Sequence, residues 1–272
     1  MNKELIKLPN RSILSIEGKD SEKFLQGIVT CNIDNIKNKL AYGSILTPQG
    51  KLLYDFIISK KNNNFLIDVS KSNIDNFIKL LNMYKLRSDV RLIKNEDLSV
   101  FVDLDKEDEN NENSDPRLAA LGLRKILNSS YKNYSNDLNI YEKKLVKLGI
   151  AEIGDGIKPG KIFPIEANLD YLNGIDFQKG CFIGQEVCSR MYRKGKVKKR
   201  IVSFKSNDNF TNNDELVYND RTVGTVIKKI EDYGIALIKI DKLINPEREK
   251  ITITSKTEKK NIEINLPKFF PV

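Results

Sequence analysis

The sequence predicts an α+β fold with antiparallel sheets and helices, followed by a C-terminal antiparallel β-barrel. Over residues 1–190, strand and helix patterns do not alternate as regular βαβ units, which favours antiparallel sheets. From about residue 197 onward, short β-rich runs alternate with turn residues, which is typical of a small barrel or sandwich. With 272 residues, the chain is long enough for two or three modest domains with buried cores.

The N-terminal elements follow from the spacing of apolar and turn-forming residues. Strands are expected over residues 11–16, 43–46, 52–58 and 64–69. The Pro/Gly segment 47–51 joins the second and third of these strands and suits a hairpin. Helices are expected after the first strand, capped by Asp20, after the fourth, capped by Ser72, and over about 136–148.

Two stretches are expected to lack regular structure. Residues 103–115 hold seven acids among asparagines and predict a solvated loop, with an acidic docking site as the less favoured alternative. Glycines and prolines over residues 154–164 predict an irregular connection. Beyond it, the strands of the barrel are expected over residues 200–204, 215–218, 222–227, 234–238, 251–254 and 262–264.

The composition excludes several kinds of chemistry. The chain has no histidine, so Ser-His-Asp and Cys-His pairs, histidine-bound metals and imidazole bases are ruled out. The cysteines Cys31, Cys181 and Cys188 are too few, and odd in number, for a disulfide framework. The formal charge of +9 is compatible with polyanionic partners, but a general bias toward Lys, Asn and Ile explains it better.

The sequence predicts a cytoplasmic protein without a membrane partner. No apolar run approaches the roughly 20 residues needed to cross a bilayer. The N-terminal residues, which include Glu4, lack the apolar stretch of a secretory signal.

The segment 179–186 holds the best candidates for chemistry. Lys179 precedes Cys181, and a cation beside a cysteine favours the reactive thiolate. The two glycines that flank the thiol leave the backbone open to a ligand. If a helix begins after the second glycine, Glu186 and Arg190 share one of its faces. The alternative is a buried, inert cysteine beside a turn glycine.

Residues 190–200 contain seven bases and no acid. This run can meet a polyanion such as tRNA or form a solvated face. Tyr192 is its one aromatic residue, whereas proteins that bind single-stranded RNA stack the bases on several rings. The solvated face is therefore favoured, and direct nucleic-acid binding is not expected.

One eight-residue motif and several shorter ones follow each other along nearly the whole chain. The long motif is Lys179-Gly180-Cys181-Phe182-Ile183-Gly184-Gln185-Glu186. The shorter ones are Phe24-Leu25-Gln26-Gly27, Pro48-Gln49-Gly50-Lys51 with Asp55-Phe56, Asp115-Pro116-Arg117 with Leu121-Gly122-Leu123-Arg124, and Pro164-Ile165-Glu166-Ala167-Asn168-Leu169-Asp170. In this order the motifs closely resemble those of the YgfZ family, whose members are related in fold to the aminomethyltransferase (T-protein) of the glycine cleavage system.

Three positions depart from the family pattern. Phe182 stands where the family usually has Tyr, Cys31-Asn32 where Asn-Asp is common, and Lys143-Lys144 where an Arg is expected. None of these departures involves Cys181.

The resemblance implies an aminomethyltransferase-like fold in three parts. Residues 1–40 and 136–196 would form a first, discontinuous α+β domain. Residues 41–135 would form a second α+β domain, and residues 197–272 the C-terminal β-barrel domain.

The resemblance also implies that tetrahydrofolate, or another reduced folate, binds in a cavity between the domains. The family-matched contacts would be Asp55, Glu186, Gln185, Gln26 and Arg190. The two carboxylates would accept paired hydrogen bonds from the pterin edge, and the two amides would add contacts. Arg190 and Lys179 would meet the anionic glutamate tail. The alternative for Asp55 is an ordinary solvated acid on a turn or an edge strand.

The resemblance favours a folate-binding accessory protein that supports assembly or repair of iron–sulfur clusters in client enzymes, including tRNA-modifying ones. Cys181 would be its functional thiol, as nucleophile, redox group or transient cluster ligand, with Lys179 beside it. One cysteine cannot hold a stable cluster, which usually needs four ligands, so client or assembly proteins are the expected partners. Cys31 and Cys188 match no signature position and are interpreted as packing residues.

Two alternatives stay open. A folate-dependent aminomethyltransferase, or another one-carbon transferase, would use Asp55 to position and protonate a folate nitrogen. An RNA-binding module rests on the basic charge alone.

Overall fold

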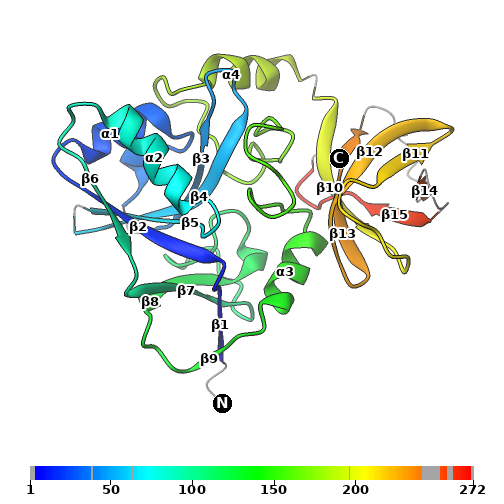
Figure 1. Cartoon of the computed structure of the whole chain (residues 1–272), viewed down its shortest axis with the longest axis horizontal. Coiled ribbons are helices and arrows are strands. Elements are labelled where there is room, and N and C mark those ends of the chain that lie inside the picture. Colours follow the sequence, from blue (N-terminus) through cyan, green and yellow to red (C-terminus); the bar gives the residue numbers. More distant parts are fainter. Residues whose placement is uncertain are drawn as a thin grey trace.

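The chain forms two β-sheets with flanking helices and a separate C-terminal barrel (Figure 1). The structure, a computed structural model, describes residues 4–240 except 38, 63 and 196, and in addition residues 252–255 and 260–270. The predicted α+β class with antiparallel sheets and a C-terminal barrel is confirmed.

The larger N-terminal sheet has five strands in the order β3-β4-β5-β2-β6, and all neighbouring strands are antiparallel. The strands are β2 (Arg11–Glu17), β3 (Ala41–Leu46), β4 (Leu52–Lys61), β5 (Asn64–Ser70) and β6 (Arg91–Asn95). Two helices, α1 (Ser21–Ile28) and α2 (Ile74–Lys85), pack beside this sheet (Figure 1). Their apolar faces, which include Leu25 and Phe77, are buried against it because both helices are amphipathic.

The smaller sheet has four strands in the order β8-β7-β1-β9. They are β1 (Leu5–Lys7), β7 (Leu98–Asp103), β8 (Leu123–Asn128) and β9 (Tyr134–Ser135). The pairing of β1 with β9 is parallel, whereas the other pairs are antiparallel. The helix α3 (Leu138–Lys147) follows and lies between this sheet and the barrel (Figure 1).

The barrel is closed by six strands in the order β10-β13-β12-β11-β14-β15. They are β10 (Lys199–Lys205), β11 (Glu215–Tyr218), β12 (Arg221–Ile230), β13 (Tyr233–Lys239), β14 (Thr252–Ser255) and β15 (Asn261–Asn265). All six expected strands are therefore present, except that Ile251 lies outside the described residues. The helix α4 (Gln185–Lys194) runs along the top of the view in Figure 1 and leads into β10.

The sheets do not follow the predicted division of the chain at residue 40. Strand β1 pairs with β7, and β2 pairs with β5 and β6, so each sheet takes strands from both sides of that boundary. The structure thus joins residues 1–40 to the segment 41–135 more closely than the prediction does. The three-domain division stays a prediction.

Both predicted helix caps act differently from the expectation. Asp20 is the N-cap of α1 by position, but its carboxylate accepts a hydrogen bond from the backbone N of Asp89 instead of a helix amide. The helix α2 begins one residue later than expected, with Asn73 as its N-cap. The Asn73 amide group donates to the carbonyl of Ile153, and Ser72 bonds to Ser70.

The acidic segment 103–115 is only partly the solvated loop that its composition predicts. Its central acids, from Asp105 to Glu112, are exposed. Asp103 and Asp115 at its two ends are buried, and Asp115 pairs with Arg117. Composition cannot separate the two cases, because the burial of an acid depends on which partners the rest of the fold brings to it. None of the helices in the described part of the chain is long and apolar enough to cross a membrane.

Candidate functional site

The segment 179–184 is anchored to the end of α1 by the side chain of Lys179. The Lys179 Nζ donates to the carbonyl oxygens of Gln26 at 2.9 Å, Val29 at 2.7 Å and Cys31 at 2.8 Å. An ammonium group has three donors, so all of them are used. Burial lowers the pKa of Lys179 to about 8. The structure thus makes Lys179 a residue that positions the loop, and its ammonium points at carbonyl oxygens.

The same loop is also locked to the β3–β4 hairpin by two glycines. Gly50 in the hairpin and Gly184 before α4 both have positive φ, 78° and 79°. A Cβ on Gly184 would lie 2.5 Å from the carbonyl oxygen of Thr47 and 3.1 Å from the Cα of Gly50. No side chain larger than hydrogen fits there, so two of the family-like motifs meet backbone to backbone.

Between these two anchors, Cys181 is exposed to solvent. A Cβ on the neighbouring Gly180 would meet no atom within 4 Å, so the space beside the thiol is open. Cys31 and Cys188 are buried, and burial raises the pKa of each thiol to about 12. The structure therefore presents one accessible thiol, on a loop that is held at both ends.

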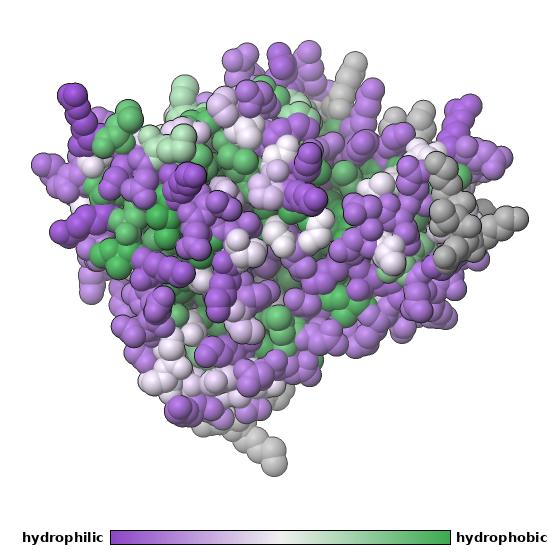
Figure 2. Space-filling model, in the orientation of Figure 1, coloured by the Kyte–Doolittle hydropathy of each residue, from purple (hydrophilic) through white to green (hydrophobic). Residues whose placement is uncertain are grey.

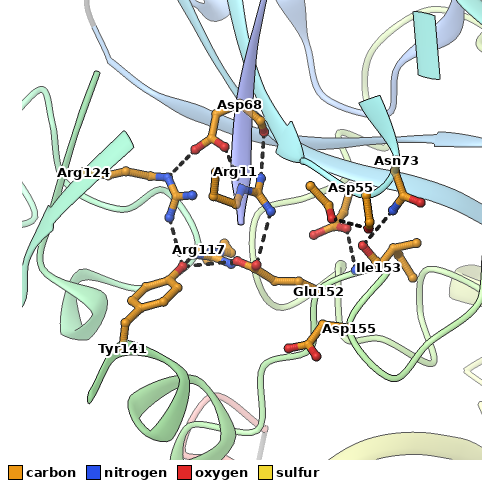
Figure 3. Close-up of polar contacts among 12 residues, drawn as sticks. Arg11, Asp55, Asp68, Asn73, Arg117, Arg124, Tyr141, Glu152, Ile153 and Asp155 are labelled. Carbon is orange, nitrogen blue, oxygen red and sulfur yellow. Dashed lines mark hydrogen bonds and ion pairs between the residues drawn. The ribbon is translucent and has the colours of Figure 1, made fainter. Parts of the chain in front are cut away.

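A buried network of ion pairs lies beneath the larger sheet (Figure 3). Its first centre is Asp68 on β5, whose carboxylate accepts from the Nε of Arg11 and the Nε of Arg124, both at 2.6 Å. Arg11 also donates to the carbonyl oxygen of Asp68 at 2.7 Å. Both arginines and Asp68 are buried, so each charge is desolvated and depends on its partner.

The second centre of the network is Glu152, in the connection after α3. Its carboxylate accepts from Arg117 at 2.7 Å, from Arg11 at 3.2 Å and from the hydroxyl of Tyr141 at 3.2 Å. Arg117 also makes a two-pronged contact with Asp115, at 2.9 and 2.7 Å. Burial alone would raise the pKa of Glu152, but the surrounding arginines outweigh it and hold that pKa far below its usual range.

Asp55 on β4 lies beside this network and behaves differently. Its two oxygens accept from the backbone N of Ile153 at 2.8 Å and from the hydroxyl of Tyr42 at 3.2 Å, and its exposed fraction is 3%. Among the described residues, no arginine forms a hydrogen bond or an ion pair with it. Burial, together with the charge of Glu152, raises the pKa of Asp55 to about 6. The alternative of a solvated acid does not hold, because the carboxyl is enclosed.

Among the described residues, no hydrogen bond or ion pair joins the side chains that were predicted to contact a folate. Asp55 is enclosed, whereas Glu186 and Arg190 are exposed on α4 and Gln185 is half-buried. The Gln26 amide accepts from the backbone N of Ile33 and donates to Asn32, each at 2.9 Å, and so braces the loop after α1.

Sequence reasoning missed the buried ion-pair network as a unit. Arg117 and Arg124 were noted only as parts of family-like motifs, and Asp68 and Glu152 were not singled out. A signal was available for Asp68, because it interrupts an apolar strand. A charged residue in a buried strand needs a partner of opposite charge nearby.

The fold belongs to a known class of structure. The aminomethyltransferase T of the glycine cleavage system from Bartonella henselae superposes with a TM-score of 0.71, over 98% of this chain and 87% of that chain. The sequence identity is 14%, so this likeness concerns the fold, and it confirms the aminomethyltransferase-like architecture. Residues 198–272 match the family described as the C-terminal beta-barrel domain of CAF17.

Relatives of the chain are found among mitochondrial proteins. The iron-sulfur cluster assembly factor IBA57 homolog of Neurospora crassa is 35% identical over 230 residues, which cover 73% of this chain and 52% of that protein. The mouse protein of the same name is 28% identical, over 72% of this chain and 65% of its own length. The chain thus matches between about half and two thirds of the length of these relatives. Their names place them in mitochondria, which overturns the expectation of a cytoplasmic protein.

Proposed function

We propose that this protein supports the assembly or repair of iron–sulfur clusters in client enzymes, including enzymes that modify tRNA. The observation that carries the proposal is the exposed Cys181 on a loop anchored at both ends. The names of the relatives from Neurospora and mouse support the same function.

The chemistry of one exposed thiol fits a transient role. A cluster usually needs four thiolate ligands, and the other two thiols of this chain are buried. Cys181 can therefore contribute one ligand to a cluster, or one bond to a thiol, while a partner protein supplies the remaining ligands. Anchoring of the loop by Lys179 and Gly184 fixes the backbone from which the thiol is offered.

The test of this proposal is a substitution of Cys181 in the host. Cys181→Ser removes the soft thiolate ligand and keeps the size of the side chain, and Cys188→Ala serves as a control because it removes a buried thiol. We expect Cys181→Ser to lower the activity of iron–sulfur enzymes at unchanged protein level, and Cys188→Ala to leave that activity near the parent's. Equal activity in Cys181→Ser and parent would refute the proposal.

We further propose that the protein binds tetrahydrofolate or another reduced folate, a proposal that rests on the family resemblance and the shared fold. The present geometry fits this ligand incompletely, because Ile153 and Tyr42 occupy both oxygens of Asp55 and Glu186 lies on an exposed face. Because the Asp55 carboxyl is also enclosed, a folate contact there would require a neighbouring segment, such as that at Ile153, to move.

Calorimetry with tetrahydrofolate tests the folate proposal directly. Asp55→Ala and Glu186→Ala should each weaken binding by about 1–3 kcal/mol if both carboxylates accept hydrogen bonds from the ligand. Glu109→Ala, which removes an exposed acid from the segment 103–115, is the control. Parent-like binding by both variants would reject these two carboxylates as folate contacts.

A further inference from the structure

The outer face of α4 is an exposed basic surface. Arg190, Arg193 and Lys194 stand three and four residues apart, so their side chains leave one face of the helix. Cys188 points to the opposite side and is buried. Two lysines that follow the helix in the chain, at the entry to β10, are also exposed. We call this surface the α4 basic face, and it consists of Arg190, Arg193, Lys194, Lys198 and Lys199.

No acid of the described part of the chain forms an ion pair with the α4 basic face. None of the ion pairs among the described residues includes any of its five members, and Arg193 donates only to the carbonyl of Ser189 in its own helix. Other lysines with acids in reach do pair, as Lys228 does with Glu142 and Asp155. In Figure 2, hydrophilic side chains project along the upper edge of the molecule, where Figure 1 places α4. Five like charges repel one another, and an acidic partner would relieve that repulsion.

The α4 basic face lies a short way along the helix from Cys181. The thiol precedes Gln185, the first residue of α4, by four residues. A helix rises about 1.5 Å per residue, so the bases of the last turn lie roughly 12–14 Å along the axis from the end next to the thiol. A partner protein docked on this face would therefore have part of its own surface beside Cys181.

We propose that the α4 basic face docks an acidic surface of the iron–sulfur protein that exchanges a thiolate-bound group with Cys181. This inference rests on the proposed function and names the chemistry of the partner. Opposite charges across such an interface speed encounter and fix orientation. The face thus favours thiol-bearing proteins whose thiols are surrounded by acidic residues over those whose thiols are not.

Two features favour an acidic protein over a nucleic acid. Tyr192, the aromatic residue of this part of α4, already stacks on Phe177 with ring centroids 3.9 Å apart, whereas single-stranded nucleic acids rely on free rings. Glu186 is exposed on the first turn of the helix, on the side of Cys181. A phosphate backbone carries a negative charge at every nucleotide and would meet Glu186 on its way to the thiol, whereas an acidic protein can present an uncharged edge at that point.

The experiment measures how the charge around an incoming thiol changes its reaction with Cys181. The probe is a peptide of Asp and Gly residues with one cysteine held as a mixed disulfide with thionitrobenzoate, and a second peptide carries Asn in place of Asp. The Cys181 thiolate attacks the sulfur of the peptide, a protein–peptide disulfide forms, and thionitrobenzoate leaves with the electron pair of the broken bond. Its absorbance gives the rate.

We expect the acidic peptide to react about tenfold faster than the neutral one at low ionic strength, with the difference lost at about 0.5 M salt. The triple variant Arg190→Glu, Arg193→Glu, Lys194→Glu should reverse the preference. A matched variant changes the net charge by the same amount at exposed lysines outside the face: Lys71→Glu, Lys79→Glu, Lys132→Glu. This variant should keep the preference for the acidic peptide. Alkylation of Cys181 by neutral iodoacetamide shows in each variant that the thiol itself is unchanged.

Equal rates for both peptides in the parent protein would overturn this inference. A second result would also overturn it: the two peptides react equally fast, and tRNA binds tightly to the parent but not to the triple variant. The face would then serve a nucleic acid. The proposed function is judged separately by Cys181→Ser in the host. If iron–sulfur enzymes need Cys181 but the acidic and neutral peptides react equally fast, only the proposed docking surface is refuted. If iron–sulfur enzymes do not need Cys181, the proposed function is refuted.

Discussion

Gly50 and Gly184 touch through their backbones: a Cβ placed on Gly184 would lie 3.1 Å from the Cα of Gly50. This contact joins the β3–β4 hairpin to the loop that carries Cys181. The two segments lie more than a hundred residues apart in the chain, so the contact ties together distant parts of the fold. Two glycines are required because both have positive φ and neither leaves room for a side chain.

Gly184→Ala should therefore destabilise the protein by about 2–5 kcal/mol. A left-handed backbone costs about 1–2 kcal/mol in a residue with a Cβ, and the clash with the Thr47 carbonyl adds about 1–3 kcal/mol. Gly160→Ala is the control, because Gly160 also has positive φ but its Cβ would meet only Leu53, at 3.9 Å. Urea unfolding compares the two variants. Equal losses of stability would show that the backbone contact adds nothing.

A second prediction concerns the anchor that Lys179 provides. Lys179→Met keeps the length of the side chain but leaves three carbonyl oxygens without their donor. We expect a loss of about 1–3 kcal/mol in the free energy of unfolding, together with faster amide exchange at residues 26–33. Lys158→Met, at an exposed lysine, should change neither quantity. Parent-like exchange at residues 26–33 in Lys179→Met would contradict the anchor.

Local pattern predicted most of the elements that surround the site. The apolar spacing around Leu25 and the Pro/Gly turn before Lys51 are local signals. The helix α1 and the β3–β4 hairpin form at these positions. All six barrel runs are strands for the same reason. The signature motif likewise identified Cys181 as the thiol to examine.

Pairing over long distances could not be predicted in this way. The partners of Asp68 are Arg11 and Arg124, 57 and 56 residues away, and no local pattern states which charges meet. Lys179 was expected beside the thiol, but its side chain crosses to carbonyls about 150 residues earlier. The strands β6 to β9 were missed because their burial depends on partners elsewhere in the chain.

A third prediction follows from the raised pKa of Asp55. Its value of about 6 in the folded protein lies above the ordinary 3.8, so the folded state binds this proton more tightly than the unfolded state. The contribution of Asp55 to stability is therefore fully present below about pH 3.8 and is lost as the pH rises through about 6. A shift of this size corresponds to about 2–3 kcal/mol.

Asp55→Asn should remove this dependence on pH. Relative to the parent, the variant should gain about 2–3 kcal/mol between pH 4 and pH 7, since comparison at equal pH cancels the contributions of other acids. Asp97→Asn, at an exposed acid, is the control and should show no such gain. A constant difference between Asp55→Asn and parent across this range would mean that folding does not raise the pKa of Asp55.

The last prediction concerns the reactivity of the three cysteines, which determines whether the anchored loop offers a usable thiol. Cys181 is exposed, whereas burial raises the pKa of Cys31 and Cys188 to about 12. At pH 8, a thiol with such a pKa is a thiolate in only about one molecule in ten thousand. Iodoacetamide should therefore modify Cys181 at least about a hundredfold faster than the other two, as followed by peptide mass spectrometry. In urea all three rates should converge, because unfolding removes the burial. Faster modification of Cys31 or Cys188 in the folded protein would show that the loop does not present Cys181 as its accessible thiol, and the proposed exchange with an iron–sulfur partner would then lose its chemical basis.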